Sequence, residues 1–168
     1  MGAVGLMGAR ARWLRVERTV TLLFFVVVGF GTLDNLANLI SGIVGRSVEI
    51  GGLQLLVSSV AVWVTNVLMF SMLYWQIDRG GPEARVNDAS TRSDWLFPQE
   101  GAPVEDVPHG WQPTFIDYLY LGYSTATAFS TTDAPLTPGA KLLMMLESAI
   151  ALVTIVVVAS RAINVLGN

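Results

Sequence analysis

Apolar residues gather into three long runs along the chain, and the stretches between the runs are polar. Each run holds roughly 20 or more mostly apolar residues, and at about 1.5 Å per helical residue this is enough to cross a hydrocarbon core of about 30 Å. Tyr74 and Trp75 close the second run, where aromatic anchors at a membrane interface are expected. The pattern predicts three transmembrane helices, over Thr19–Ile40, Leu53–Ile77 and Ala140–Leu166.

A fourth apolar segment, Thr114–Phe129, is too short to cross. About 16 helical residues reach only about 24 Å. Thr114 and Asp117 have the spacing of a capping box, which predicts a helix start. Thr137 followed by Pro138 predicts a second start, with threonine as the N-cap and proline at the first helical position.

These two starts bracket the hydroxyl-rich stretch "STATAFSTTDAPLTP", Ser124–Pro138. Lipid does not tolerate unsatisfied backbone, so such a stretch belongs outside the membrane or in a loop shielded by protein. The preferred interpretation is a short re-entrant helix, a loop and then the third span. The alternative is an amphipathic helix lying flat on the membrane, but the tyrosines and leucines of Tyr118–Tyr123 leave no broad polar face.

The predicted fold is therefore an all-α integral membrane protein with three transmembrane helices and a re-entrant helix between the second and third. We divide the chain into a basic amino terminus (1–18), two transmembrane helices (19–77), a polar loop (78–113) and a channel-like module (114–168). The polar loop is rich in Pro, Gly, Asp and Glu, which predicts partial order at most. Its apolar island "SDWLFP", Ser93–Pro98, is expected to pack back on the membrane face in preference to forming a separate domain.

Composition agrees with a membrane protein. Of 168 residues, 52% are hydrophobic and 14% charged, whereas a soluble domain carries about a quarter charged residues. The chain has no cysteine, which excludes disulfides and thiolate chemistry. Its net charge of −3 does not suggest a nucleic-acid partner. The single histidine, His109, lies in the polar loop without a catalytic frame, so we expect neither an enzyme nor a metal or cofactor site.

The stretch "TATAFSTTD" followed by "GAKLLMMLESAIAL" resembles the pore helix, filter and inner helix of two-span potassium channels. Their pattern is T-x-T-T-V-G-Y-G-D-x-x-P, with an L-E-S-like stretch in the inner helix. On that pattern Thr125 and Thr127 match the first threonines, Phe129 the valine and Asp133 the aspartate. Pro135 or Pro138 matches the proline, and Leu146, Glu147 and Ser148 match the inner-helix residues.

A closer likeness covers more of the chain, through "WVTNVLMFSMLYWQIDRGGP", "DWLFPQ", "DYLYLGYSTATAFSTTD" and "RAINVL". These segments are similar to a family of uncharacterised bacterial inner-membrane proteins related to the pore-loop ion channel superfamily. The resemblance implies a multi-pass protein of the bacterial inner membrane that works as a homo-oligomer, a tetramer if it forms a pore. Family members are often longer at the amino terminus, so it also implies a short or truncated member.

The chain departs from the channel pattern where the filter has Gly-Tyr-Gly. Ser130, Thr131 and Thr132 stand there instead. A potassium filter turns successive carbonyls toward the ion, and glycine permits the positive φ this needs whereas β-branched threonine resists it. The filter is thus degenerate. Hydroxyls of Thr125 to Thr132 could coordinate a monovalent cation, with Asp133 at the entrance; equally, they could satisfy backbone groups at a helix end.

Charge distribution predicts the topology. The positive-inside rule places the amino terminus in the cytoplasm because of Arg10, Arg12, Arg15 and Arg18. The loop with Arg79, Arg85 and Arg92 also favours the cytoplasm. With three spans the carboxyl terminus then lies outside, and the re-entrant helix enters from the cytoplasmic face. Potassium channels insert theirs from the other face.

Charged residues within the spans need partners. Asp34 and Arg161 lie toward the far ends of the first and third spans, which run parallel, so the sequence predicts an ion pair with a structural role in preference to a gating one. By the resemblance, Glu147 lies behind the filter and braces the re-entrant helix through its hydroxyls. Two functions remain open: a poorly selective monovalent cation channel, and a non-conducting accessory protein that keeps a pore-loop fold.

Overall fold

The computed structural model describes residues 52–87, 92–128 and 134–166, together with positions 23, 27–29, 31, 34, 37, 38 and 41. This part of the chain is predominantly helical, as the hydrophobic pattern predicted. The elements in chain order are α2 (Gly52–Ile77), the short 3₁₀ helix η1 (Asp78–Gly80), α3 (Pro82–Asn87), β1 (Trp95–Leu96), the 3₁₀ helix η2 (Pro98–Glu100), α4 (Phe115–Ala126), β2 (Ala134–Pro135) and α5 (Pro138–Leu166).

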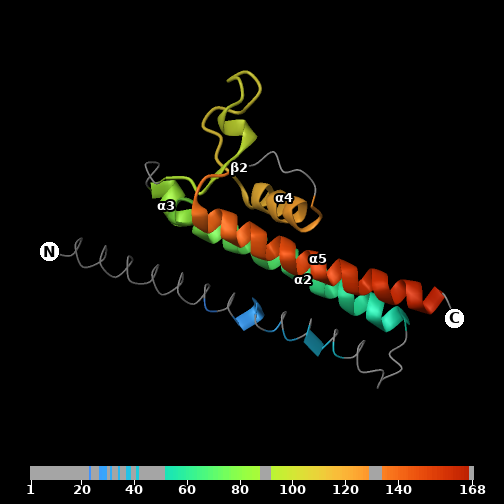
Figure 1. Cartoon of the computed structure of the whole chain (residues 1–168). Helices are drawn as coiled ribbons and strands as arrows, with labels where there is room; N and C mark the ends of the chain where they lie inside the picture. Colours follow the sequence, from blue (N-terminus) through green and yellow to red (C-terminus); the bar gives the residue numbers. More distant parts are fainter. Residues whose placement is uncertain are drawn as a thin grey trace.

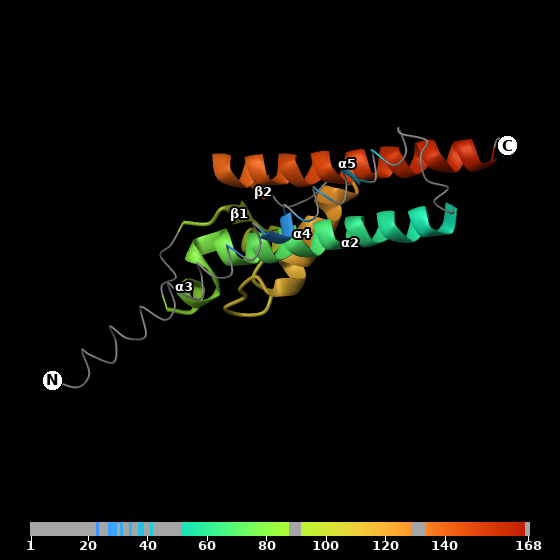
Figure 2. The ribbon, with the colours of Figure 1, turned by 90° about the horizontal axis from the view of Figure 1, so that it is seen from below.

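The two long helices α2 and α5 lie side by side and run in opposite directions (Figures 1 and 2). Near the end of α2, Tyr74 contacts Glu147 in the first half of α5. Near its start, Ser59 lines the same groove as Thr154, further along α5. Their bounds match the second and third predicted runs to within about two residues.

Within the described residues, two helical stretches are long and apolar enough to cross a membrane, Leu56–Gly80 and Pro138–Val157. The first predicted span, Thr19–Ile40, lies largely outside the described part. The positions described in it are helical. Val28 packs against the core of the molecule, and a Cβ on Gly29 would lie 3.5 Å from the sulfur of Met69.

Both long helices are apolar outside and partly polar inside. Exposed side chains include Val57, Val60, Val64 and Leu68 on α2, and Leu142, Met145, Leu152 and Val156 on α5. The buried polar side chains on these helices are Ser59, Asn66, Ser71, Glu147 and Thr154, with Asp78 just after α2. A surface helix of a soluble protein has the reverse pattern. The distribution therefore supports association with a membrane.

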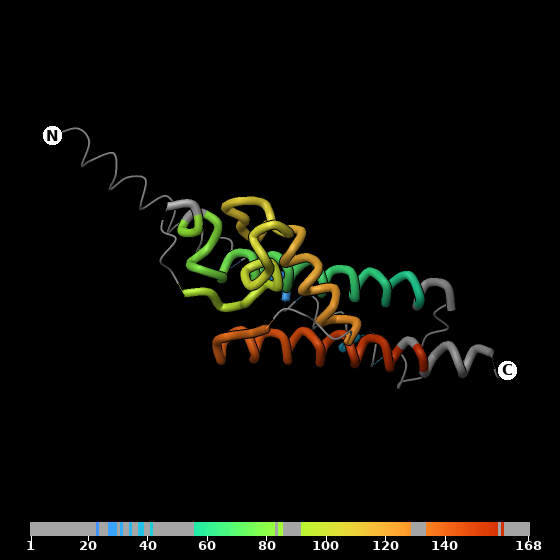
Figure 3. Tube along the Cα trace, turned by 90° about the horizontal axis from the view of Figure 1, so that it is seen from above, coloured from blue at the N-terminus to red at the C-terminus, as the bar shows by residue number. Residues whose placement is uncertain are grey.

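Helix α4 crosses the α2–α5 pair near the end where α2 finishes and α5 begins (Figure 3). Its predicted start is confirmed: the backbone N–H of Thr114 donates to the Asp117 carboxylate at 2.7 Å. It ends at Ala126, earlier than the predicted Phe129, because Thr127 turns the chain and Ala128 takes a left-handed conformation with φ 56°. Figure 1 shows that α4 is much shorter than either neighbour.

Aromatic contacts fix the direction of α4. Its first residue, Phe115, packs edge-on against Trp75 at the end of α2, with ring centroids 5.9 Å apart. Near its other end, Tyr123 packs edge-on against Trp63 at 5.8 Å. The helix therefore runs antiparallel to α2, from the carboxyl end of α2 toward its middle.

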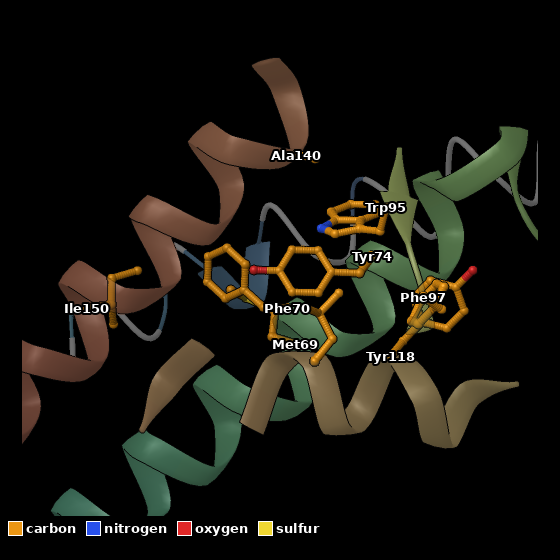
Figure 4. Packing of buried hydrophobic residues seen from close by; sticks show 9 residues of the cluster. Met69, Phe70, Tyr74, Trp95, Phe97, Tyr118, Ala140 and Ile150 are labelled. Atoms are coloured by element: carbon orange, nitrogen blue, oxygen red, sulfur yellow. The ribbon is translucent and has the colours of Figure 1, made fainter. Parts of the chain in front are cut away.

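The polar loop carries more regular structure than its composition indicates. Trp95 and Phe97 are buried in the main core with Tyr74 and Tyr118, as Figure 4 shows, so the "SDWLFP" island packs against the helices of the protein itself. Tyr74 was interpreted as an interfacial anchor, and this was wrong. It is fully buried because the Trp95 ring covers it at 4.8 Å.

The loop is also tied to the start of α5. Strands β1 and β2 form a two-stranded antiparallel sheet, with Trp95 opposite Pro135. The Thr137 hydroxyl accepts a hydrogen bond from the backbone N–H of Ala140 at 3.2 Å, which confirms Thr137 as the N-cap. The same hydroxyl donates to the Asp94 carboxylate at 2.7 Å. One side chain thus caps α5 and anchors the loop.

Candidate functional site

The candidate site is the region where α4 packs against α2 and α5. Thr125 and Thr127 occupy the last turn of α4 and its C-cap. The Thr125 hydroxyl donates to the Leu121 carbonyl at 2.8 Å, and the Thr127 hydroxyl donates to the Tyr123 carbonyl at 2.8 Å. In this arrangement both hydroxyl hydrogens satisfy backbone of their own helix. Their lone pairs remain as possible acceptors for a ligand.

Ser148 joins α5 to α4. Its hydroxyl donates to the Thr125 backbone carbonyl at 3.2 Å, in the last turn of α4. The resemblance placed Ser148 in the inner helix behind the pore loop, and the structure brings it into contact with the end of the short helix. A polar side chain of α5 therefore supports the end of α4.

Glu147 is completely buried where α2, α4 and α5 meet. Its Oε2 accepts a hydrogen bond from the Tyr74 hydroxyl at 2.5 Å, and Figure 4 shows Tyr74 projecting from α2 toward α5. Its other oxygen, Oε1, has no hydrogen-bond partner among the residues that the structure describes. Asn66 of α2 donates to the Glu147 backbone carbonyl at 3.3 Å. The hydrogen bond of the Glu147 side chain thus goes to Tyr74 rather than to a hydroxyl of α4.

Gly122 is the residue of α4 that faces this carboxyl. A Cβ added at Gly122 would overlap the Ser71 hydroxyl oxygen and would lie 3.3 Å from both Glu147 Oε1 and the Val67 carbonyl oxygen. Only glycine lets the backbone of α4 approach α2 and α5 this closely, in the way small residues permit close helix packing in membranes. The position of α4 therefore depends on Gly122.

A second buried polar cluster lies at the carboxyl end of α2. The Asp78 carboxylate is fully buried and accepts hydrogen bonds from the Tyr118 hydroxyl at 2.6 Å and from the Asp94 backbone N–H at 2.7 Å. Arg79 lies 3.7 Å from the same carboxylate and forms an ion pair with Glu100. Asp78 therefore connects α2, the polar loop and α4.

Arg85 completes this cluster. Its guanidinium donates to the carbonyls of Trp75 at 2.8 Å and Asp78 at 3.0 Å, so a cation caps the carboxyl end of α2, where the helix dipole favours positive charge. It also lies 5.2 Å from the centre of the Tyr118 ring. Burial lowers the pKa of Arg85 and raises the pKa of Tyr118, whose hydrogen bond to Asp78 raises it further. Tyr118 is thus held as the neutral donor.

A mostly apolar groove of about 500 Å³ opens beside the end of α4. It is lined by Ser59, Val60 and Trp63 of α2, by Thr127, and by Thr154, Ile155 and Ala159 of α5. Thr127 therefore lies at the carboxyl end of α4, next to a groove between the two long helices.

Several predicted site residues lie outside the described part of the chain: Phe129, Ser130, Thr131, Thr132 and Asp133. The side chain of Arg161 also lies outside it, so the predicted ion pair with Asp34 stays a prediction. Asp34 itself is exposed and accepts a hydrogen bond from the Asn38 side chain at 3.0 Å.

Sequence reasoning missed Asp78, Arg85 and Tyr118 as a unit. It counted Arg79 and Arg85 only for topology. Two signals were available: an aspartate at the boundary of an apolar run, and an arginine seven residues beyond it across two glycines. Neither signal identifies Tyr118, which lies 40 residues further along the chain.

Comparisons with protein-family models, curated proteins and solved structures found no match. The site therefore has to be interpreted from its own geometry.

Proposed function

We propose that this chain is an integral membrane protein whose α4, hydroxyl-rich stretch and α5 form a pore-loop module, and that a homo-oligomer of it conducts monovalent cations with poor selectivity. The observation that carries the proposal is that the chain is held at the same end of the α2–α5 pair both before and after α4.

The chain enters α4 beside Trp75, at the carboxyl end of α2, and α4 leads it inward to the level of Trp63. At Ala134–Pro135 the chain again lies at the carboxyl end of α2, where β2 pairs with β1 and Trp95 is buried. A transmembrane helix enters at one end and leaves at the other, whereas a surface helix does not reach inward. This geometry favours a re-entrant helix.

Chain length is compatible with such a return. The 12 residues of α4 rise about 18 Å at about 1.5 Å each. Five residues separate Ala128 from Ala134, so the chain makes six residue-to-residue steps, which reach at most about 20 Å. The reach of this segment is therefore only slightly longer than the rise of α4, so a return would need a nearly extended chain. In a pore-loop protein this return would carry Ser130 to Asp133 along the permeation path.

Homo-oligomerisation follows from the geometry of the proposal. One re-entrant loop per chain supplies only one sector of a pore, so several copies must surround an axis, four by likeness to potassium channels. Irregular backbone at membrane depth also has to be shielded by protein. A third span over Thr19–Ile40, near α2 through Val28 and Gly29, would complete the subunit.

A non-conducting accessory role is the second candidate, and one observation favours it. The hydroxyl hydrogens of Thr125 and Thr127 are both donated to carbonyls of α4, as expected if these residues serve only to end the helix. In this role the pore-loop fold is kept as a scaffold within a larger assembly.

The deciding experiment measures potassium and sodium flux with the purified protein in liposomes. A conducting protein should lose flux in Asp133→Asn, which removes a charge that concentrates cations, while the exposed loop variant Glu105→Gln keeps it. Thr127→Val, nearly isosteric, should change conductance or ion preference. Absence of flux in the wild type would support the accessory role, whereas equal flux in all variants would mean that cations pass without Thr127 and Asp133.

The orientation needs a separate measurement. In the bacterial inner membrane, the arginines of the amino terminus place it in the cytoplasm, so a reporter fused after Asn168 should read extracytoplasmic. A cytoplasmic reading there, with an extracytoplasmic reading at the amino terminus, would reverse the predicted orientation and correspond to that of a potassium channel.

A further inference from the structure

Glu147 is the charged side chain on α5 that the described structure buries completely, and the channel proposal gives it only a supporting role. It accepts a hydrogen bond from Tyr74, and within the described part of the chain its Oε1 has no partner. Neither ion pair formed by the described residues involves it. An ionised carboxylate buried with one neutral donor is costly, whereas the proton-bearing form is neutral.

We propose that Glu147 is a proton-binding site that couples pH to the packing of α4. With the proton bound, the neutral carboxyl fits among the uncharged groups that surround it between α2 and α5, and the backbone of α4 packs against it at Gly122. On losing the proton, the carboxylate needs water or a cation. Oε1 is the oxygen that has to be solvated, and it is the oxygen that Gly122 covers.

Among the residues that the structure describes, few other groups near Glu147 can account for a pH response. On α2 the titratable group in contact is Tyr74; Asn66 and Ser71, also from α2, are neutral. On α4 the facing residue is Gly122, and Trp95 of the loop covers Tyr74 from the side. On α5 itself Lys141 is exposed. The charged cluster of Asp78, Arg79 and Arg85 lies beyond Tyr74, at the end of α2, and contacts Tyr118.

Ionisation therefore favours a state in which α4 has moved away from α2 and α5 at Gly122, so that water reaches Glu147. The inference concerns the packing of α4 and does not require conduction. If the protein does conduct, it predicts that rising pH changes the open probability.

The test uses a single reporter cysteine, which the cysteine-free chain permits. Ser124 on α4 is buried, so Ser124→Cys should be protected from a soluble maleimide while α4 is packed. Labelling rates across pH are compared in two backgrounds, with Glu147 and with Glu147→Gln, which mimics the protonated carboxyl. The rate in the Glu147→Gln background reports the pH dependence of the thiol itself. Dividing the rate measured with Glu147 by this rate gives the corrected labelling rate.

With Glu147 present, the corrected labelling rate should rise with pH by up to about tenfold per pH unit, since one proton is linked to the change. Tyr74→Phe removes the donor that supports the ionised form, and it should move the midpoint to higher pH. The control Glu105→Gln, an exposed carboxyl, should leave the profile unchanged. The carbonyl stretch of a protonated carboxyl should appear in infrared spectra below the midpoint and vanish in Glu147→Gln.

Identical corrected profiles in the Glu147 and Glu147→Gln backgrounds would overturn the proposal, as would a Tyr74→Phe midpoint equal to that of the parent. A protein without ion flux but with the Glu147-dependent profile would refute conduction alone. Flux without the profile would refute the proton site alone.

Discussion

The Tyr118 hydroxyl of α4 donates a 2.6 Å hydrogen bond to the fully buried Asp78 carboxylate at the end of α2. This contact joins residues 40 positions apart and holds the start of the short helix against the long one. It stands beside Arg85, whose guanidinium caps the α2 carbonyls and covers the Tyr118 ring. The position of α4 is thus fixed at its start by this cluster and at its middle by Gly122.

Tyr118→Phe should destabilise the protein by about 1–3 kcal/mol, because a buried carboxylate loses a donor while the ring packing is kept. Thermal unfolding in detergent measures the change. Tyr120→Phe is the matched control, since Tyr120 lies on the same helix and is exposed. Equal, small shifts in the two variants would contradict a structural role for the Tyr118–Asp78 contact.

The same tyrosine predicts a response at alkaline pH. The pKa of Tyr118 in the folded protein is raised above its ordinary value of 10.0 by burial and by the hydrogen bond to Asp78. Above pH 10 the unfolded chain therefore releases this proton more readily than the folded one, and stability falls as pH rises. Below about pH 10 the contribution is fully present.

Unfolding free energies measured between pH 8 and about pH 11 check this. The wild type should lose more stability over the alkaline part of this range than Tyr118→Phe does, because the variant lacks the titrating group. Parallel pH profiles for the two proteins would show that Tyr118 does not remain protonated in the folded state.

Local signals made much of the fold predictable from sequence. The bounds of α2 and α5 followed from the length of the apolar runs, and the starts of α4 and α5 followed from Thr114, Asp117 and Thr137, whose capping bonds are formed between neighbours in sequence. Such features depend on residues within one turn of each other, so a single sequence contains them.

The candidate site was less predictable because its contacts are distant in sequence. The burial of Glu147 was anticipated, but its partner Tyr74 was assigned to the membrane interface, since nothing local indicates that Trp95 covers it. Gly122 was not singled out, because a glycine within an apolar segment gives no sign of which side chains from two other helices approach it. Only the assembled helices define these contacts.

Gly122→Ala should destabilise the folded protein by about 1–3 kcal/mol, because the new methyl group overlaps the Ser71 hydroxyl and presses on Glu147 Oε1. Removing the nearest atom with Ser71→Ala should recover part of this loss in the double variant, so the two changes should be non-additive. Gly139→Ala is the control: a Cβ there would meet no atom closer than 4.0 Å, and alanine favours the helix.

Chemical or thermal unfolding of the wild type, the two single variants and the double variant in one detergent completes the double-mutant cycle, with Gly139→Ala measured beside them. Additive losses for Gly122→Ala and Ser71→Ala would mean that α4 does not approach Ser71 at Gly122. A loss in Gly139→Ala as large as that in Gly122→Ala would point to a general intolerance of the extra methyl group instead of close packing.

The end of α4 provides the last prediction. Ala128 follows the C-cap Thr127 with φ 56°, and at such a position a side chain crowds the backbone whereas glycine does not. Ala128→Gly should therefore stabilise the protein by up to about 1 kcal/mol, although the more flexible unfolded chain offsets part of the gain. Ala126→Gly makes the same chemical change two residues earlier, inside the helix and at a buried position, and should destabilise by about 1 kcal/mol or more. Opposite shifts in unfolding temperature for the two variants would support the left-handed turn that sends the chain back toward β2. Destabilisation by both would place Ala128 within the helix and remove the turn on which the re-entrant path depends.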